Sequence, residues 1–185
     1  PRPMIQLDII SDPICPWCYI GKAKLDQALE SAGAQPFDIH WRPFQLNPDM
    51  PPEGMDRRAY LEGKFGKDRA RSFYAQIEEA ARDAGLDVDF AAFTRYFRQG
   101  QDISDQDVLL DAAEAAGMER ESVARLLSGD ADRAEVIAAD QEARGMGVQG
   151  VPTFIVARQY VLSGAQDPAL WRKVIAELTG AEAAQ

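Results

Sequence analysis

Both cysteines of this chain lie in one four-residue motif, Cys15-Pro16-Trp17-Cys18. The motif follows an apolar segment at 4–10 and a turn sequence at 11–13. If residues 16 onward form a helix, positions three apart lie on one face, so the two sulfurs can close a small disulfide without a change of fold. We therefore predict thiol chemistry for this chain.

The start of a helix would tune the reactivity of these thiols. Cys15 is expected at the helix N-terminus, where unpaired N–H groups and the positive end of the helix dipole lower the pKa of a thiol. Cys15 is therefore the expected attacking thiolate. Pro16 suits the first helical turn because it lacks an N–H and its φ is already helical. Trp17 is the variable residue that tunes the pair.

Three other uses of a cysteine pair explain the motif less well. A zinc site needs two further soft or imidazole ligands, yet the chain has 2 cysteines and 1 histidine, His40. A structural disulfide across so short a loop removes little chain entropy. Two inert buried thiols would leave the intervening Pro-Trp unexplained. We therefore expect no metal ligands and no organic cofactor.

Charge and hydropathy narrow the classes of partner. The formal net charge is −10 and the pI is about 4.6, whereas nucleic acid and anionic membranes attract clustered Lys and Arg. No apolar stretch approaches the span of a bilayer, and no signal-peptide pattern opens the chain. We expect a soluble, cytoplasmic protein without nucleic-acid or membrane partners. Because the sequence starts at Pro1, the removal of a leader peptide stays an open alternative. A CxxC pair is compatible with both reducing and oxidising compartments.

The first part of the chain predicts a strand, a helix and a second strand. Apolar residues alternate over 4–10 and again over 37–41, and they follow helical spacing over 18–32, with Gly33 as a C-cap. A strand-helix-strand unit whose helix opens with CxxC favours a thioredoxin-like parallel pair with a right-handed crossover.

The rest of the chain predicts a helical insertion and a closing hairpin. Helical patterns cover 56–65, 68–84, 91–99, 105–116, 119–127 and 132–144. Strand character returns at 151–156 and 160–162, around a turn at 157–159, before a helix that Asp167-Pro168 caps. The predicted fold class is α/β: a discontinuous thioredoxin-like domain of residues 1–52 and 146–185, with a large all-helical subdomain inserted at 53–145.

Several spaced motifs together resemble the FrnE-like branch of the DsbA family, over nearly the whole chain. They are Asp12, Cys15-Pro16-Trp17-Cys18-Tyr19, Trp41-Arg42-Pro43-Phe44, Leu46-Asn47-Pro48, Gly147-Val148, Gly150-Val151-Pro152-Thr153-Phe154 and Ser163-Gly164-Ala165-Gln166. The resemblance implies a DsbA-like thioredoxin fold and thiol–disulfide oxidoreductase activity. It makes Cys15 the nucleophile and Cys18 the resolving thiol. It also implies a cis-proline at Pro152, and substrate contacts from Pro16, Trp17, Val151 and Pro152.

Two features depart from the family pattern. Periplasmic oxidants of the family typically have histidine where this chain has Trp17, so a strongly stabilised thiolate is not carried over. Relatives also have a longer stretch where this chain runs from Val88 to Phe93. We predict that residues are missing there, which would leave adjacent Cα atoms farther apart than the roughly 3.8 Å of a trans peptide.

The expected function is disulfide exchange with protein or small thiol substrates through a mixed disulfide. Glutathione is a candidate co-substrate and a homodimer a candidate assembly. Two alternatives stay open: a glutathione-dependent isomerase of the 2-hydroxychromene-2-carboxylate type, in which serine usually replaces the first cysteine, and a non-catalytic peptide-binding or chaperone module. The natural substrate and the direction of electron flow stay open too. The ionisable residues Asp8, Asp12, Lys22 and His40 receive no catalytic role.

Overall fold

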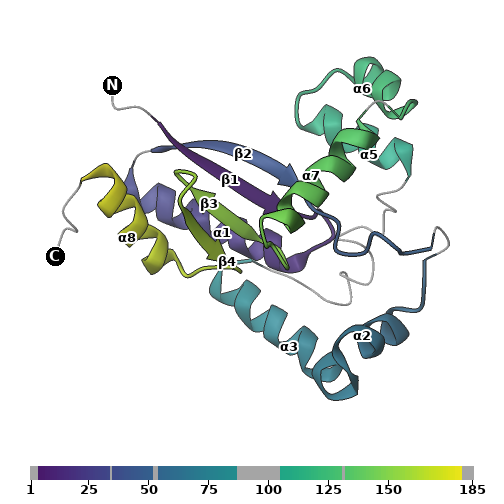
Figure 1. The fold of residues 1–185 in the computed structure, drawn as a ribbon, viewed down its shortest axis with the longest axis horizontal. Helices are drawn as coiled ribbons and strands as arrows, with labels where there is room; N and C mark the ends of the chain where they lie inside the picture. The colour runs from purple at the N-terminus through teal and green to yellow at the C-terminus, as the bar shows by residue number, and fades with distance from the viewer. Residues whose placement is uncertain (1–3, 34, 52–53, 87–104, 131, 181–185) are drawn as a thin grey trace. The chain divides into compact units, whose positions relative to one another are not determined.

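The computed structural model describes residues 4–33, 35–51, 54–86, 105–130 and 132–180 (Figure 1). Its elements are β1 Ile5–Ser11, α1 Pro16–Ala32, β2 Phe37–Pro43, α2 Arg57–Phe65, α3 Lys67–Asp83, α5 Gln106–Ala115, α6 Arg120–Leu127, α7 Arg133–Gly145, β3 Thr153–Val156, β4 Tyr160–Ser163 and α8 Pro168–Thr179. The predicted helix at 91–99 and the predicted break between Val88 and Phe93 lie outside the described residues. None of the described helices combines the length and the hydropathy needed to cross a bilayer.

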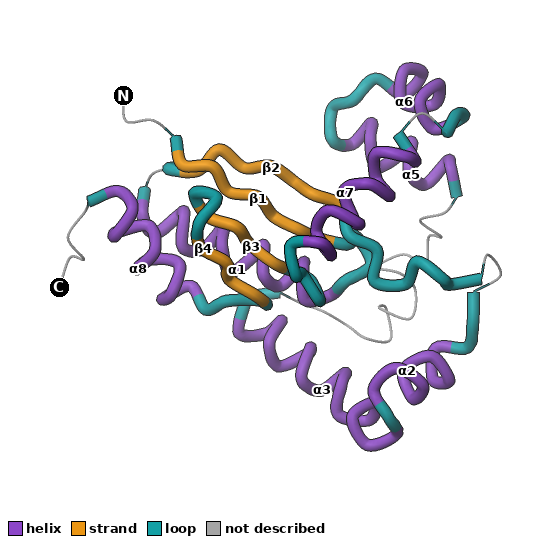
Figure 2. Tube along the Cα trace, in the orientation of Figure 1, coloured by secondary structure: helices purple, strands orange, loops and turns teal. Residues whose placement is uncertain are grey.

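The four strands form one mixed sheet in the order β2-β1-β3-β4 (Figure 2). Strands β1 and β2 are parallel, with Ile5 opposite Phe37, and α1 connects them as the sequence predicts. Strand β3 runs antiparallel to both β1 and β4. The sheet therefore joins strands within residues 5–43 to strands within residues 153–163, and the predicted thioredoxin-like α/β fold is confirmed.

Helix α1 begins and ends where its local sequence requires. Cys15 is the N-cap, in an extended conformation with φ −89° and ψ 114°, and Pro16 is the first helical residue. Gly33 ends the helix at φ 62°, in the left-handed region where a residue without Cβ is favoured. The cysteine motif is therefore held at the first turn of a helix of 17 residues.

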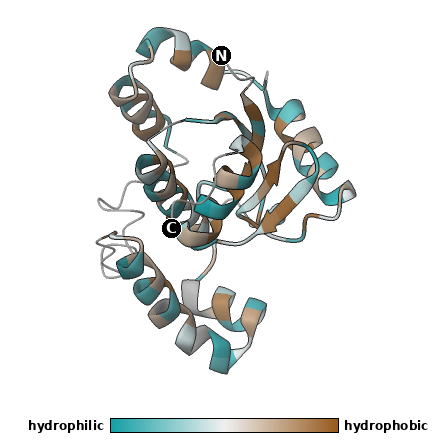
Figure 3. Cartoon of the chain, turned by 90° about the vertical axis from the view of Figure 1, so that its left-hand side faces the viewer, coloured by the Kyte–Doolittle hydropathy of each residue, from teal (hydrophilic) through white to brown (hydrophobic). Residues whose placement is uncertain are grey.

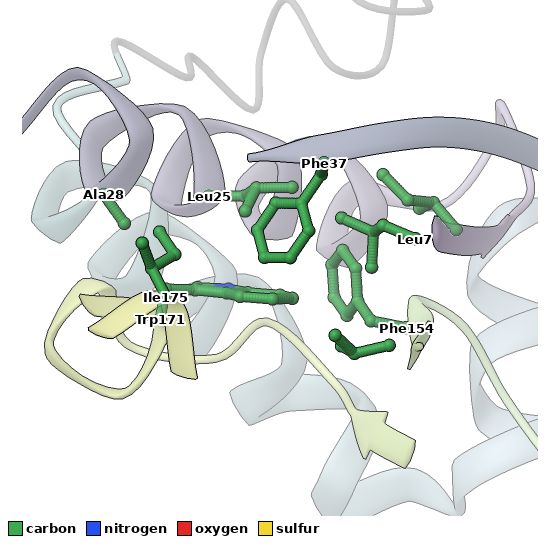
Figure 4. Packing of buried hydrophobic residues seen from close by; sticks show 9 residues of the cluster. Leu7, Leu25, Ala28, Phe37, Phe154, Trp171 and Ile175 are labelled. Atoms are coloured by element: carbon green, nitrogen blue, oxygen red, sulfur yellow. The ribbon is translucent and has the colours of Figure 1, made fainter. Parts of the chain in front are cut away.

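The main core lies on one face of the sheet, between the strands and the helices α1 and α8. Trp171 is fully buried, and its ring packs edge-to-face with those of Phe154 and Phe37 at centroid distances of 4.9 and 6.3 Å (Figure 4). The other buried members of the cluster are Leu7, Ile9, Leu25, Ala28, Val156 and Ile175. The brown colour of hydrophobic residues accordingly appears along the strands in Figure 3. Each large side chain buried here contributes about 1.5–3 kcal/mol.

A smaller cluster covers the opposite face of the sheet. Its buried members are Ile10, Phe44 and Ala143, with Val148 and Val151 packed against them. These residues come from β1, from the segment after β2, from the end of α7 and from the loop before β3. The cluster therefore brings the loop that contains Val151 against the end of β1, which leads into the cysteine motif.

The chain divides into two compact units, residues 1–86 with 139–185, and residues 87–138. This division differs from the insertion predicted at 53–145, because α2, α3 and the last turns of α7 fall in the unit that contains the sheet. The Gln27 side chain of α1 donates to the carbonyl oxygen of Ala84 at 2.8 Å, just past α3. The Asp140 carboxylate of α7 accepts the backbone N–H of Gln45 at 2.9 Å. Such long-range contacts leave no signal in the local sequence pattern.

We expect Trp171→Ala to lower the free energy of unfolding by about 3–5 kcal/mol, because it leaves a cavity among the core rings. Trp41→Ala provides a matched control, since Trp41 is 53% exposed on the edge strand β2. Its cost should stay below about 1 kcal/mol. Urea unfolding followed by circular dichroism measures both, and equal costs would contradict this placement of the core.

Candidate active site

Asp12 organises the turn that leads into the cysteine motif. Its backbone carbonyl accepts the N–H of Cys15 at 3.0 Å, and its carboxylate accepts the N–H of Ile14 at 3.0 Å. The carbonyl of Cys15 then accepts the N–H of Cys18 at 3.1 Å. This turn places both cysteines on the first turn of α1, where their spacing of three brings the sulfurs to one side.

Both cysteines are free and buried, with 5% of Cys15 and 7% of Cys18 exposed. The hydrogen bond between the two thiols raises the pKa of Cys15 above its ordinary value, and burial adds to this rise. The same hydrogen bond lowers the pKa of Cys18, with a further contribution from the Ser11 side chain. When the pair loses one proton, Cys18 therefore becomes the thiolate and Cys15 stays protonated.

This result differs from the lowered pKa that we predicted for Cys15. Although Cys15 is the N-cap of α1, its side chain makes no capping hydrogen bond. Its Sγ instead lies 3.5 Å from the backbone carbonyl oxygen of Val151. A carbonyl oxygen accepts a hydrogen bond from the neutral thiol. The hydrogen bond with Cys18 and the burial of Cys15 raise the pKa of Cys15 despite its position at the helix start.

Val151 and Pro152 reach the site from the other end of the chain. The Val151–Pro152 peptide bond is cis, and Pro152 is fully buried. The Pro152 carbonyl accepts the N–H of Gly164 at 2.8 Å, and the Thr153 hydroxyl donates to the Gly150 carbonyl at 2.8 Å. These bonds hold the loop in place, so the Val151 carbonyl faces Cys15 across 136 positions of sequence.

Gly21 is a site-shaping residue that the sequence analysis missed. A Cβ at this position would lie 3.0 Å from Pro152 Cγ and 3.4 Å from both Phe154 Cζ and the Ala165 Cα. Gly21 therefore lets α1 approach the loop that contains Pro152. A glycine inside an apolar helical pattern is the signal that could have revealed such a close approach.

An open cleft of about 700 Å³ borders the Val151–Pro152 loop. It is lined by the segment 146–153 together with Ile155, Arg158, Val161, Ser163 and Gly164. Most of these residues are apolar or glycine, and Arg158 is the sole charged member of this lining set. The loop that touches Cys15 thus forms one end of a groove along β3 and β4.

Two buried carboxylates hold the segment after β2 beside this site. The Asp12 carboxylate accepts the N–H of Leu46 at 2.8 Å. Asp140 accepts the N–H of Gln45 at 2.9 Å and pairs with Arg144, whose Nε donates to it at 2.8 Å. Arg144 also donates to the Gln45 carbonyl at 2.6 Å. Its guanidinium hydrogen bond lowers the pKa of Asp140.

The remaining ionisable residues that we considered have partners away from the sulfurs. His40 contacts Asp38 at 3.0 Å on the exposed side of β2, and Lys22 pairs with Asp26 at 2.5 Å one turn along α1. The Asp8 carboxylate accepts from Arg42 at 3.0 Å. Pro16 and Trp17 are half-buried beside the cysteines. Within the part of the chain that the structure describes, no group of three or more His, Cys, Asp or Glu side chains suits a metal ion.

Comparison with known proteins identifies the family. A family model described as the DSBA-like thioredoxin domain matches residues 6–176. The chain belongs to this family. The DsbA-like proteins are a family of thiol–disulfide oxidoreductases, which agrees with the cysteine pair at the start of α1 and with the fold described above.

Individual relatives are distant but match over nearly their whole length. The uncharacterized protein YwbO of Bacillus subtilis is 23% identical, and the match covers 94% of this chain and 96% of YwbO. The probable DsbA oxidoreductase SCO1869 of Streptomyces coelicolor superposes with a TM-score of 0.80 at 24% identity, over 98% of this chain and 92% of its own. A 2-hydroxychromene-2-carboxylate isomerase superposes with a TM-score of 0.66 at 14% identity, over 94% and 96%. At these identities the two structures show a shared fold.

We expect Gly21→Ala to lower the free energy of unfolding by about 1–3 kcal/mol, because the added methyl group overlaps the rigid Pro152 ring. The matched control is Gly63→Ala in α2, where an added Cβ has nothing within 4 Å. That change should raise stability by up to about 1 kcal/mol through helix propensity. Thermal and urea unfolding compare the two variants, and stabilisation by both would show that α1 does not need the glycine.

We expect Asp140→Asn to cost about 1–3 kcal/mol at pH 7, because a charged acceptor of Arg144 and Gln45 is lost. The folded-state pKa of Asp140 is lowered, so its contribution is complete above the unfolded pKa of about 3.9 and is lost as the pH falls through the folded pKa. The difference in unfolding free energy between wild type and variant should therefore shrink below about pH 4.

Glu142→Gln is the control for this prediction, since Glu142 is exposed on the same helix. It should change stability by less than about 0.5 kcal/mol at neutral and acid pH. Urea unfolding at a series of pH values gives both curves. A cost of Asp140→Asn that stays constant down to pH 3 would rule out an ionic role for this carboxylate.

Proposed function

We propose that this protein catalyses thiol–disulfide exchange, with Cys15 as the nucleophile and Cys18 as the resolving thiol. The observation that carries this assignment is the direction that each sulfur faces. Cys15 Sγ contacts the Val151 carbonyl, on the loop that forms one end of the cleft. Cys18 instead interacts with the side chain of Ser11, the last residue of β1, and with the backbone of Asp12 in the turn that follows. Cys15 is therefore the sulfur that a substrate in the cleft meets.

The first step of the exchange is a proton transfer between the two cysteines. The lowered pKa of Cys18 favours its thiolate, and this thiolate takes up the Cys15 proton along the hydrogen bond between the two sulfurs. The Cys15 thiolate attacks one sulfur of a substrate disulfide, and the other sulfur leaves as a thiolate. Cys18 then gives its proton to the departed thiolate and attacks the Cys15 sulfur of the mixed disulfide, which breaks the bond between Cys15 and the substrate sulfur.

This second attack releases the reduced substrate. Two electrons have moved from the cysteine pair to the substrate, and the Cys15–Cys18 disulfide has formed. The reverse sequence oxidises a substrate dithiol. The four sulfur atoms suffice for either direction, so the proposal requires no metal or organic cofactor. Glutathione is the small thiol that we propose as a co-substrate.

The Val151–Pro152 loop and the start of α1 flank the reacting sulfur. We assign Val151 the role of pairing its backbone with an extended substrate, as an exposed strand-like segment does in peptide recognition. Pro152 supports that loop from its buried position. Pro16 and Trp17 contact the substrate from the helix side. The FrnE-like branch, a homodimeric assembly and a cytoplasmic location remain predictions from the sequence.

We expect Cys15→Ser to reduce the rate of exchange by about 10³-fold or more, the scale at which the loss of a catalytic nucleophile acts. Cys18→Ser should instead accumulate a mixed disulfide on Cys15, because nothing resolves it. Incubation with glutathione disulfide and with a disulfide-linked peptide, followed by mass spectrometry of the intact protein and its fragments, measures both outcomes.

Other outcomes would point to other functions. An adduct on Cys18 in the Cys15→Ser variant would exchange the roles of the two cysteines. Glutathione-dependent turnover of a hydroxychromene carboxylate that survives Cys18→Ser would indicate the isomerase. Peptide binding that is unchanged in Cys15→Ser, with no adduct in either variant, would indicate a binding module.

A further inference from the structure

Arg158 is the single charged side chain among the residues that line the cleft. The chain as a whole has 30 acidic and 20 basic side chains, so a lone cation in an otherwise neutral groove is a local exception to its charge. Val161 lines the same groove and is 60% exposed. The groove thus presents apolar surface along its length and one positive charge at the β3–β4 turn.

Among the residues that the structure describes, no carboxylate forms an ion pair with Arg158, and the partner that holds its side chain is neutral. The Nε of Arg158 donates to the amide oxygen of Gln6 at 2.7 Å. The amide nitrogen of Gln6 donates in turn to the Asp8 carboxylate at 2.8 Å, and Arg42 neutralises Asp8. Asp8 therefore orients the Gln6 amide so that its oxygen faces Arg158. A neutral acceptor fixes the position of the guanidinium without pairing its charge.

Other arginines in the described part of the chain differ from Arg158 because they form ion pairs. Arg42, Arg120 and Arg144 each contact a carboxylate, that of Asp8, Asp111 and Asp140 respectively. Arg158 contacts an amide where these contact an acid. The guanidinium fork of Arg158 is thus positioned to take its anionic partner from elsewhere.

The backbone at this turn is a second, independent observation. Ala157 and Arg158 have φ values of 53° and 57°, in the left-handed region that glycine enters freely and other residues enter at a cost. A strained turn that keeps a long side chain where glycine would be easier points to a function of that side chain.

The length of the groove indicates the kind of ligand. Strand β3 has 4 residues between Pro152 and the turn, and at about 3.3 Å per residue it spans roughly 13 Å. A tripeptide is at most about 10 Å long when fully extended. If its central sulfur lies at Cys15, neither end reaches a guanidinium that is held at Gln6. An extended polypeptide covers this distance with four or five residues.

We propose that Arg158 recognises an acidic side chain of the polypeptide that lies in the cleft, four or five residues from the substrate cysteine. This inference rests on the proposed function and adds to it a residue that determines specificity. Apolar side chains of the segment contact Val161 and Ile155, and its backbone meets Val151 at the end of the groove beside Cys15.

Binding of cysteine-free peptides tests the inference without thiol exchange. Each fluorescent peptide carries serine in place of the cysteine and either Glu or Gln four or five residues before or after it. We expect wild-type protein to bind a Glu peptide about 5-fold more tightly than its Gln partner, the scale of one partly exposed charge pair. Anisotropy titration measures the dissociation constants.

The decisive variant is Arg158→Gly, which removes the guanidinium and relieves the left-handed backbone. It should abolish the preference for Glu while its melting temperature stays equal to or above that of wild type. The matched control is Arg172→Ala, on the exposed side of α8, which should keep the preference. A preference that survives Arg158→Gly, or disappears in both variants, overturns the inference, as does wild-type protein that binds neither peptide.

The exchange assay on wild-type protein separates this inference from the proposed function. Protein that distinguishes Glu from Gln peptides through Arg158 but exchanges no disulfide supports the recognition site and refutes the enzymatic role. Protein that exchanges disulfides but treats both peptides alike supports the enzymatic role and refutes the recognition site.

Discussion

Antiparallel pairing of β1 with β3, with Ile10 opposite Thr153, is the constraint on which the site depends. Because the two strands run in opposite directions, the end of β1 meets the beginning of β3. The residues just after β1 lead into the cysteine motif, and those just before β3 are Val151 and Pro152. A slip of one residue would turn every side chain of β3 to the opposite face and remove Phe154 from the core. Burial of the core therefore enforces the register that brings Val151 to Cys15.

A second constraint comes from polar groups around the segment 45–46. The backbone N–H of Gln45 donates to the Asp140 carboxylate, and that of Leu46 donates to the Asp12 carboxylate. Both carboxylates are buried. Asp12 lies before the cysteine motif, whereas Asp140 lies on α7, which leads into the loop before β3. One short stretch of backbone is thus tied to both sides of the site. Buried carboxylates that are satisfied in this way support a unique arrangement, because an unpaired one would be costly.

The fold alone does not decide the chemistry. A probable oxidoreductase and a 2-hydroxychromene-2-carboxylate isomerase both superpose on this chain over more than nine-tenths of its length. What favours redox exchange is the presence of two thiols that share a hydrogen bond, one of which faces the cleft through Val151. Function in this family is carried by such local groups on a common scaffold. The groove beside them, with Arg158 at its far end, adds a means to select among polypeptides.

The sequence by itself determined the strands, the described helices, the cysteine motif and the family resemblance. Hydrophobic period, caps and turn residues act over a few positions, so they can be read locally. Only the tertiary structure decided that the Val151 carbonyl meets Cys15, that Gly21 makes room for Pro152, and that α2 and α3 fall in the unit that contains the sheet. The sequence predicted a lowered pKa for Cys15, whereas in the structure the pKa of Cys18 is lowered and that of Cys15 is raised. These outcomes depend on contacts between residues far apart in the chain, whose distances and burial no local pattern encodes.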